Sequence, residues 1–226
     1  EALDKWREYV MSFGFGQKLG SDFPSALGGN IPDSKYYNRV YRKGGWKATT
    51  VISLSIGQGE IGCTPLHLAN LCATVANRGF YYTPHIIKDS DNVTIDQKYK
   101  EKNYTMVDTT HFHKVIGGMY KAVNSGYGSG GTASVAAVEG LEICGKTGTA
   151  QNNGKDHSVF MGFAPMDNPQ IAIAVYVENG GFGATYGVPI GALMMEQYLT
   201  GTLSEESEKK VEYFANRVID YGEQTR

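Results

Sequence analysis

The pattern of hydrophobic and polar residues predicts five main helices and one short one. In the main helices, apolar residues recur every three or four positions, which places them on one side of the helix. In the helix at residues 65–78 they surround most of the circumference, which predicts a buried helix. Helix-ending glycines follow at Gly14, Gly79 and Gly201, and Thr64 and Ser204 are suited to cap helix starts. The predicted helices span residues 1–13, 65–78, 109–124 and 188–199 and a last one begins after Ser204, with a short helix expected near residues 132–136.

Apolar runs separated by tight turns predict strands in the second half of the chain. Connections as short as "NNGKD" and "MDNP" require antiparallel neighbours. A hairpin is also expected at residues 81–88 and 93–99, a β-rich segment before "SIGQGEIG", and a long surface excursion over residues 14–45. The three main strands are expected at residues 142–151, 158–165 and 170–178.

This order of elements predicts an α+β fold, an antiparallel sheet flanked by helices. Residues 1–201 are expected to form one domain and residues 202–226 a helical extension. Glu1 opens the chain without Met and already in helical periodicity, so we expect the sequence to begin inside a longer protein.

Composition narrows the range of partners. With 21 Lys plus Arg against 23 Asp plus Glu, the net charge of -2 gives no reason to expect nucleic acid as a partner. The three cysteines lack metal-site spacing, and His111 and His113 point to different sides of a helix, so no metal site is expected. No run of about 18 apolar residues occurs.

One stretch, residues 139–160, matches two motifs. "GLEICGKT" fits the nucleotide-binding pattern G-x-x-x-x-G-K-[ST], and "KTGT", Lys146–Thr149, fits the third motif of penicillin-recognising serine enzymes. A phosphate-binding loop needs a helix that starts at the Lys-Thr pair. The following "GTAQNNGKD" is a poor helix start, which favours the second motif.

Three blocks carry a wider resemblance. "CGKTGTAQ", then "DHSVFMGFAP" and "IAIAVYVENG", resemble the last third of a penicillin-binding protein transpeptidase domain, and "SIGQGEIGCTPLHLANLCATVANRG" resembles its class B members, especially the elongation-type penicillin-binding protein 2 subfamily. The resemblance covers about residues 3–199. It implies a β-lactamase/transpeptidase-like fold, incomplete at its N-terminus.

The resemblance implies a peptidoglycan D,D-transpeptidase that forms an acyl-serine from D-Ala-D-Ala stem peptides and binds β-lactams, with no cofactor. Lys146 and Thr149 would be catalytic, Thr149 through a backbone N–H in the oxyanion hole. Thr147, Gly148 and Thr149 would bind substrate. Gly57, Gln58 and Gly59 would form a supporting loop. Implied partners are a cell-wall glycosyltransferase and the elongation machinery.

The family places its nucleophile in S-x-x-K and its second motif in S-x-N. We expect no S-x-x-K among the serines from Ser12 to Ser207 and expect both motifs to lie before Glu1, so that this chain alone is inactive. The letters "SDN" at Ser90–Asn92 are expected to be a turn. The resemblance implies that the parent protein is anchored in the cell inner membrane by a segment outside this chain, with this domain in the periplasm.

Other interpretations stay open. The same fold serves penicillin-sensing or non-catalytic binding domains, and a serine β-lactamase is a third alternative. His157 and Tyr186 could face the cleft or serve packing, while Ser158 lacks an evident base and is not expected to be a nucleophile.

Overall fold

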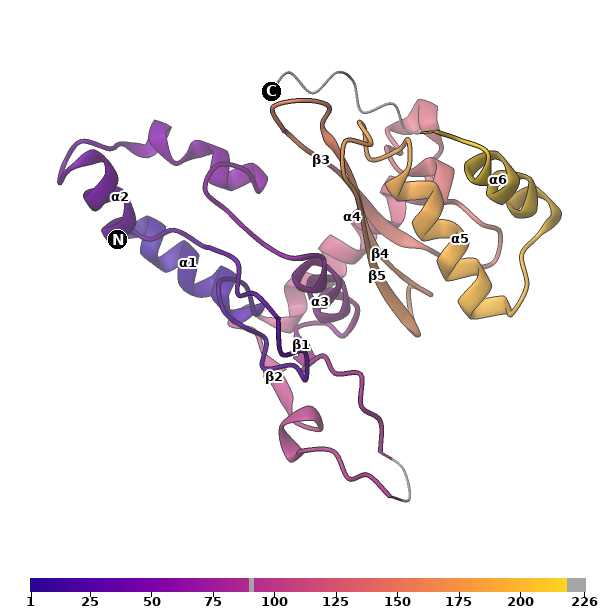
Figure 1. Ribbon diagram of the computed structural model, residues 1–226, viewed down its shortest axis with the longest axis horizontal. Helices are drawn as coiled ribbons and strands as arrows, with labels where there is room; N and C mark the ends of the chain where they lie inside the picture. Colours follow the sequence, from indigo (N-terminus) through magenta and orange to yellow (C-terminus); the bar gives the residue numbers. More distant parts are fainter. Residues whose placement is uncertain (90–91, 219–226) are drawn as a thin grey trace. The chain divides into compact units, whose positions relative to one another are not determined.

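The computed structural model describes residues 1–89 and 92–218 (Figure 1). The chain forms two compact units. Unit 1 comprises residues 1–74 and 79–108, and unit 2 comprises residues 75–78 together with the chain from residue 109 onward. In the described part, no helix is both long and apolar enough to cross a bilayer.

Unit 1 is mainly helical. Its helix α1 ends where predicted, because Gly14 follows with a φ of 93° that a side chain would disfavour. Its elements are α1 (Ala2–Ser12), α2 (Ser34–Tyr41), most of α3 (Pro65–Ala76), the paired strands β1 (Phe80–Tyr82) and β2 (Lys102–Tyr104), and 3₁₀ helices at Ala48–Thr50, Ile52–Ile56 and Gln97–Tyr99.

Helix α3 confirms the predicted buried helix, although part of its buried surface is polar. Thr74 is fully buried and its hydroxyl donates to the Asn70 carbonyl at 2.7 Å. Asn70 in turn donates its amide to the Phe13 carbonyl at 3.0 Å, and the ring nitrogens of His67 contact Thr64 and the Gln17 carbonyl. Each polar group is therefore paired, which offsets the cost of burying it.

Two expectations for residues 14–62 are wrong. The supposed excursion contains α2, an eight-residue helix whose Tyr37 is fully buried. The supposed β-rich segment forms 3₁₀ helices, and Gly57 ends the second of them in the left-handed region. Both segments are too short to show a period, and contacts distant in sequence decide their structure.

The predicted hairpin is wrong in its second strand. β1 pairs with β2 at residues 102–104 instead of with residues 93–99. The Asp89 carboxylate accepts from the Ile95 N–H at 2.8 Å and pairs with Lys100 at 2.6 Å, so it holds the intervening segment as a loop. Ser90 and Asp91 lie outside the described residues.

Unit 2 has the predicted antiparallel sheet, in the order β3-β4-β5. The helix ahead of it and the two after it lie where the pattern placed them, and α5 follows one side of the sheet (Figure 1). Its elements are α4 (Phe112–Asn124), β3 (Cys144–Ala150), β4 (His157–Ala164), β5 (Ile171–Val177), α5 (Gly187–Thr200), α6 (Glu205–Ala215), and 3₁₀ helices at Thr109–His111, Tyr127–Ser129 and Ser134–Ala136.

The core of unit 2 is built around Phe160, a fully buried residue at the centre of β4. Three glycines make room for its ring. A Cβ added at Gly145 or Gly191 would lie 2.5 Å from a ring carbon, and one at Gly162 would lie 3.0 Å away. Because these glycines come from β3, α5 and β4, the close packing sets how the three elements approach one another.

Helix α6 begins at its predicted cap, since Ser204 accepts from the Ser207 N–H. It is anchored to α5 by the buried Glu196 carboxylate, which accepts from the Ser204 N–H at 2.8 Å and from the Ser207 hydroxyl. Burial raises the pKa of Glu196, but these hydrogen bonds outweigh it and the pKa lies below its usual value. This stabilisation is present at neutral pH and is lost as the pH falls through the lowered pKa.

The predicted apolar side of α6 is only partly confirmed. Phe214 lies 5.9 Å from the ring of Tyr186, centroid to centroid. Val211 is exposed, and Val218 lies beyond the helix with 88% of its surface exposed. Ile219 lies outside the described residues. The helix is therefore held more by Glu196 and Phe214 than by an apolar stripe.

We predict that Gly191→Ala destabilises the protein by about 1–3 kcal/mol, because its methyl group would overpack the Phe160 ring. The matched control is Gly118→Ala in α4, where an added Cβ meets nothing within 4 Å. That change should stabilise by roughly 0.5–1 kcal/mol through helix propensity. Urea unfolding measures both, and equal effects of the two substitutions would contradict the packing described.

Thiol labelling should resolve the three cysteines. Burial raises the pKa of all three thiols, to about 12 for Cys72 and Cys144, and Cys63 is the cysteine that is exposed. The thiolate is the reactive form. At pH 8 we expect one thiol to react with a disulfide reagent in the native protein and three in guanidinium. Rapid native labelling of a Cys63→Ser variant would contradict the burial.

Candidate active site

The candidate site is the edge strand β3. β4 pairs with one edge of β3, and none of the strands in the described part pairs with the other. Its residues Lys146–Thr149 were the predicted site. Lys146 is exposed and the next three residues are half-buried. An unpaired strand edge offers backbone N–H and C=O groups to an extended peptide.

The register of β3 against β4 divides the site residues between the two faces of the sheet. Thr147 lies opposite Phe160, and Thr149 lies opposite Ser158. Since paired residues share a face, both threonines lie on the side of the Phe160 core. Lys146 alternates to the other face. The side chains of Lys146 and of the two threonines thus leave the strand on opposite faces, and the long lysine side chain bends back toward Thr147.

The polar side chains of this strand contact one another. The Lys146 ammonium donates to the Thr147 carbonyl at 2.6 Å and lies 3.3 Å from the Thr147 hydroxyl. The Thr147 hydroxyl is 3.4 Å from that of Thr132, an exposed residue in the segment after α4. One positive charge and two hydroxyls are therefore gathered beside an open strand edge.

The glycine-rich loop between β5 and α5 packs against the same strands. A Cβ added at Gly183 would lie 2.7 Å from the Gly148 carbonyl oxygen and 2.6 Å from that of Val159. Ser158 holds the loop: its hydroxyl donates to the Phe182 carbonyl at 2.8 Å and accepts from the Gly187 N–H at 3.0 Å. Only a residue without a side chain allows this approach at position 183.

Three further candidates have structural contacts. Ser158 is fully buried and committed to the loop, as expected of a residue that is not a nucleophile. His157 accepts from the Asn179 N–H through Nδ1 at 3.0 Å, which secures the start of the loop. Tyr186 is buried against Phe214, and the Arg217 guanidinium lies 4.7 Å from its ring centre. Packing is thus the role that the structure supports for both His157 and Tyr186.

The structure excludes a phosphate-binding loop at "GLEICGKT". Lys146 and Thr147 lie within β3, and the element that follows is the antiparallel strand β4 instead of a helix. No helix N-terminus is therefore available for phosphate at this position.

The expectation that the chain contains no S-x-x-K is wrong as a statement about letters. "SEKK" at Ser207–Lys210 fits the pattern. In the structure, Ser207 is buried in α6 and its hydroxyl donates to Glu196, while Lys210 pairs with Glu206 at 2.9 Å. Ser207 is inaccessible, and Lys210 is paired with Glu206 instead of with Ser207. The role that these contacts support is to anchor α6 to α5.

The remaining predicted residues are distributed over the chain. Gly57, Gln58 and Gly59 form a turn in unit 1, where Gly59 packs so closely that an added Cβ would lie 2.7 Å from the Ser53 hydroxyl. Both His111 and His113 are exposed. Within residues 1–89 and 92–218, no group of three His, Cys, Asp or Glu side chains is placed to hold a metal ion.

Sequence reasoning missed Thr132 and Gly183. Gly183 lies in a glycine-rich segment that the pattern marks as a loop, and Thr132 lies at the start of a short predicted helix. Both are brought to β3 by tertiary contacts. The glycine spacing in "ENGGFGATYG" was the one available signal for Gly183, because repeated glycines indicate close backbone approach.

An edge strand that carries an ammonium group, hydroxyls and a glycine is suited to bind a peptide with a terminal carboxylate. Its K-T-G sequence is one of the three motifs of the penicillin-recognising serine enzymes. The family model of the penicillin binding protein transpeptidase domain matches residues 2–196. The chain therefore belongs to the penicillin-binding protein transpeptidase domain family.

Several relatives are similar to this chain over most of its length. The chain is 36% identical over 203 residues to the peptidoglycan D,D-transpeptidase MrdA of Acinetobacter baumannii, covering 81% of this chain and 29% of that protein. It is 29% identical to MrdA of Haemophilus influenzae, and the match covers 90% of this chain and 34% of that protein. PBP2 of Pseudomonas aeruginosa, solved in complex with WCK 5153, has a TM-score of 0.75 at 33% identity, covering 90% of this chain and 44% of that one. The chain spans about a third of the curated relatives' length.

We predict that Ser158→Ala destabilises the protein by about 1–3 kcal/mol, because the buried Gly187 N–H loses its acceptor. The exposed Ser129→Ala is the control and should change stability by less than about 0.5 kcal/mol. Hydrogen exchange of the Gly187 amide gives a second readout, which should accelerate only in the first variant. Unchanged exchange there would show that Ser158 does not hold the loop.

Proposed function

We propose that the protein containing this chain is a serine D,D-transpeptidase that crosslinks peptidoglycan, and that β3 forms one wall of its active site. The observation that carries the proposal is the KTGT motif on an open strand edge in a chain that matches the transpeptidase family over residues 2–196. The similarity to two MrdA proteins supports a penicillin-binding protein 2 type.

Each residue of the motif has a proposed role. Lys146 supplies positive charge beside the substrate carboxylate, and the hydroxyls of Thr147 and Thr149 donate hydrogen bonds to it. Gly148 lets the substrate backbone lie close to the strand. The backbone N–H of Thr149 forms half of the oxyanion hole, a donor that contributes about 3 kcal/mol to transition-state stabilisation.

We propose that the nucleophilic serine and the second motif belong to sequence outside this chain. Acylation needs a serine with a base within hydrogen-bond reach. The contacts of Ser207 and Ser158, both buried and committed to structural hydrogen bonds, support this proposal. The chain by itself is then inactive, and the reaction in the whole protein is acyl transfer from D-Ala-D-Ala to a neighbouring stem.

The proposal extends to location and partners. A peptidoglycan crosslinking domain acts where its substrate is, so we place it on the periplasmic side of the cell inner membrane, anchored by sequence outside this chain. β-lactams would acylate the same serine. A cell-wall glycosyltransferase and the elongation machinery are the proposed protein partners, on the basis of the resemblance to the penicillin-binding protein 2 subfamily.

Labelled penicillin tests the proposal. We expect a covalent adduct on the whole protein and none on the 226-residue chain. In the whole protein, Lys146→Ala should slow acylation by roughly 100-fold or more, as expected for loss of an electrostatic contact in the transition state. The control Lys121→Ala removes an exposed lysine of α4 and should leave the rate unchanged. An adduct on the isolated chain, or equal rates for both variants, would overturn the assignment.

A further inference from the structure

Residues 34–59 of unit 1 contain five basic residues and no acidic one, in a chain whose net charge is -2. All five side chains are exposed. They belong to α2 and the segment just after it, so they are close together along the chain. We call this set, Lys35, Arg39, Arg42, Lys43 and Lys47, the α2 basic surface.

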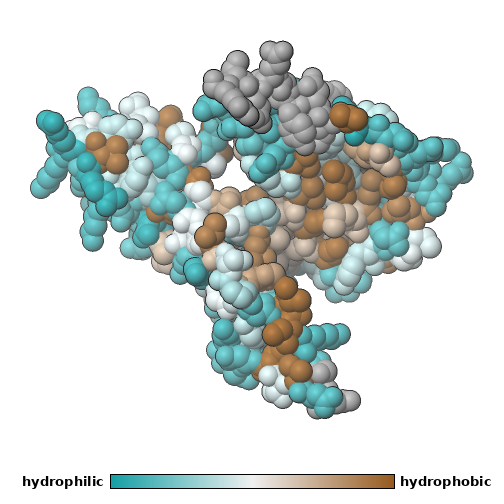
Figure 2. All heavy atoms as spheres, viewed as in Figure 1, coloured by the Kyte–Doolittle hydropathy of each residue, from teal (hydrophilic) through white to brown (hydrophobic). Residues whose placement is uncertain are grey.

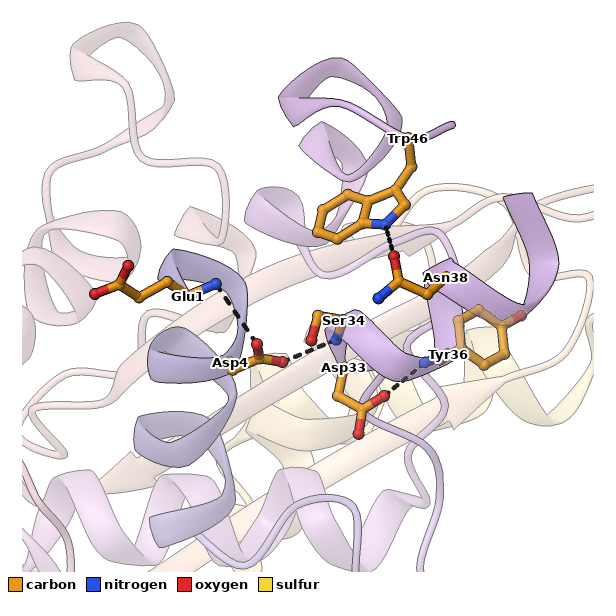
Figure 3. Close-up of polar contacts among 7 residues, drawn as sticks. All are labelled: Glu1, Asp4, Asp33, Ser34, Tyr36, Asn38 and Trp46. Atoms are coloured by element: carbon orange, nitrogen blue, oxygen red, sulfur yellow. Dashed lines mark hydrogen bonds and ion pairs between the residues drawn. The ribbon is translucent and has the colours of Figure 1, made fainter. Parts of the chain in front are cut away.

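The helix that carries this surface is held firmly by other parts of unit 1 (Figure 3). Asp33 caps it by accepting from the Tyr36 N–H at 2.7 Å, and Asp4 of α1 accepts from the Ser34 N–H at 2.8 Å. After the helix, the Trp46 indole N–H donates to the Asn38 side chain at 2.9 Å. Both ends of the helix are therefore fixed.

The carboxylates bonded to this helix are committed to internal hydrogen bonds. Asp33 and Asp4 accept backbone N–H groups, and the bond from Ser34 lowers the pKa of Asp4. Glu60 accepts from the hydroxyl of the buried Tyr37 at 2.5 Å. Among the residues that the structure describes, none of the five basic side chains forms an ion pair. The positive charge is therefore left for a group from outside the chain.

The arrangement of the charges suits a ligand with several anionic groups. Lys35 and Arg39 are four residues apart, so they project from the same side of α2, while Tyr37 faces the interior. Arg39 and Arg42 can each bind a carboxylate through two N–H groups. A flexible polymer with repeated carboxylates can contact several of these side chains at once.

The chemistry of the surface favours a hydrated polyanionic polymer over a lipid bilayer. Figure 2 draws this end of unit 1 mainly teal and white, with isolated brown atoms. Val40 and Tyr41 are the large apolar residues exposed on α2, and Ile52 and Ile56 are exposed in the 3₁₀ helix after the basic residues. Binding within a bilayer interface needs a broad apolar face in addition to basic residues.

We propose that the α2 basic surface docks the carboxylate-bearing peptide chains of peptidoglycan. This rests on the proposed function, because it assigns a second contact to that substrate. The surface belongs to unit 1, whereas the KTGT strand belongs to unit 2. It holds the polymer through charge, so the contact weakens with salt.

The test is co-sedimentation of the whole protein with purified peptidoglycan sacculi over a range of salt concentrations. The variant Lys35→Gln/Arg39→Gln/Lys43→Gln removes three charges from exposed positions. We expect it to bind about 10-fold more weakly at low salt, with a shallower salt dependence. The matched control, Lys88→Gln/Lys114→Gln/Lys121→Gln, removes three exposed lysines outside the surface and should bind within about 2-fold of the parent. Circular dichroism checks that both variants fold like the parent.

Several outcomes would overturn the proposal. Equal weakening of both variants would show attraction by net charge alone, and no binding by the parent would remove the surface as a docking site. Sacculi whose carboxyl groups have been amidated should lose binding, and retained binding would contradict carboxylate recognition. If the protein bound phosphatidylglycerol vesicles more tightly than sacculi, and the triple variant weakened that binding, the ligand of the surface would be a membrane.

Labelled penicillin separates this proposal from the proposed function. In the whole protein, the triple variant of the α2 basic surface should acylate at the parent rate while losing affinity for sacculi. Lys146→Ala should acylate more slowly than the parent while keeping the parent's affinity for sacculi. Failure of acylation in the parent would count against the transpeptidase assignment, whereas parent-like binding of sacculi by the triple variant would count against the α2 basic surface alone.

Discussion

The contact of the Phe160 ring with three glycines is the constraint on which unit 2 depends. At 2.5 Å from a hypothetical Cβ of Gly145 or Gly191, the ring occupies space that any side chain would need. β3, β4 and α5 consequently approach more closely than ordinary side chains allow. Because Thr147 lies opposite Phe160, the same packing also fixes the position of β3, the strand that carries the candidate site.

The loop between β5 and α5 further supports the candidate site. Its backbone lies on Gly148 and Val159 and is held by the Ser158 hydroxyl. The strand edge is thus supported by backbone contacts, which do not change with rotamer. Pre-organisation of this kind benefits a site that must hold its hydrogen-bond donors fixed while charge develops on a substrate.

The sequence predicted unit 2 much better than unit 1, and the reason is physical. β3, β4 and β5 are joined by short turns, and long apolar helices surround them, so local periodicity carries the information. α2 has only eight residues, and its place is decided by Tyr37, Asp4 and Glu60, which lie far apart in sequence. The position of the second hairpin strand depends on side-chain contacts of Asp89 with Ile95 and Lys100, which hydrophobic periodicity does not indicate.

Parts of the candidate site could likewise be predicted from the sequence, and other parts could not. The KTGT letters and the strand that carries them could be found from the sequence, and so could the rejection of a phosphate-binding loop. Thr132 and Gly183 could not, since nothing in a glycine-rich segment specifies which residue will reach β3. Short patterns also mislead: Ser207 and Lys210 fit S-x-x-K, yet the serine's partner is Glu196, eleven residues earlier.

The register of β3 against β4 has a consequence for how such a protein can vary in length. Side chains alternate along a strand, so deleting one residue between Gly145 and Thr149 would turn a threonine outward and the lysine into the core. The turn at residues 151–156 is mostly exposed and has no such restriction. Insertions and deletions in related proteins should therefore concentrate in that turn, while the spacing from Gly145 to Thr149 stays constant.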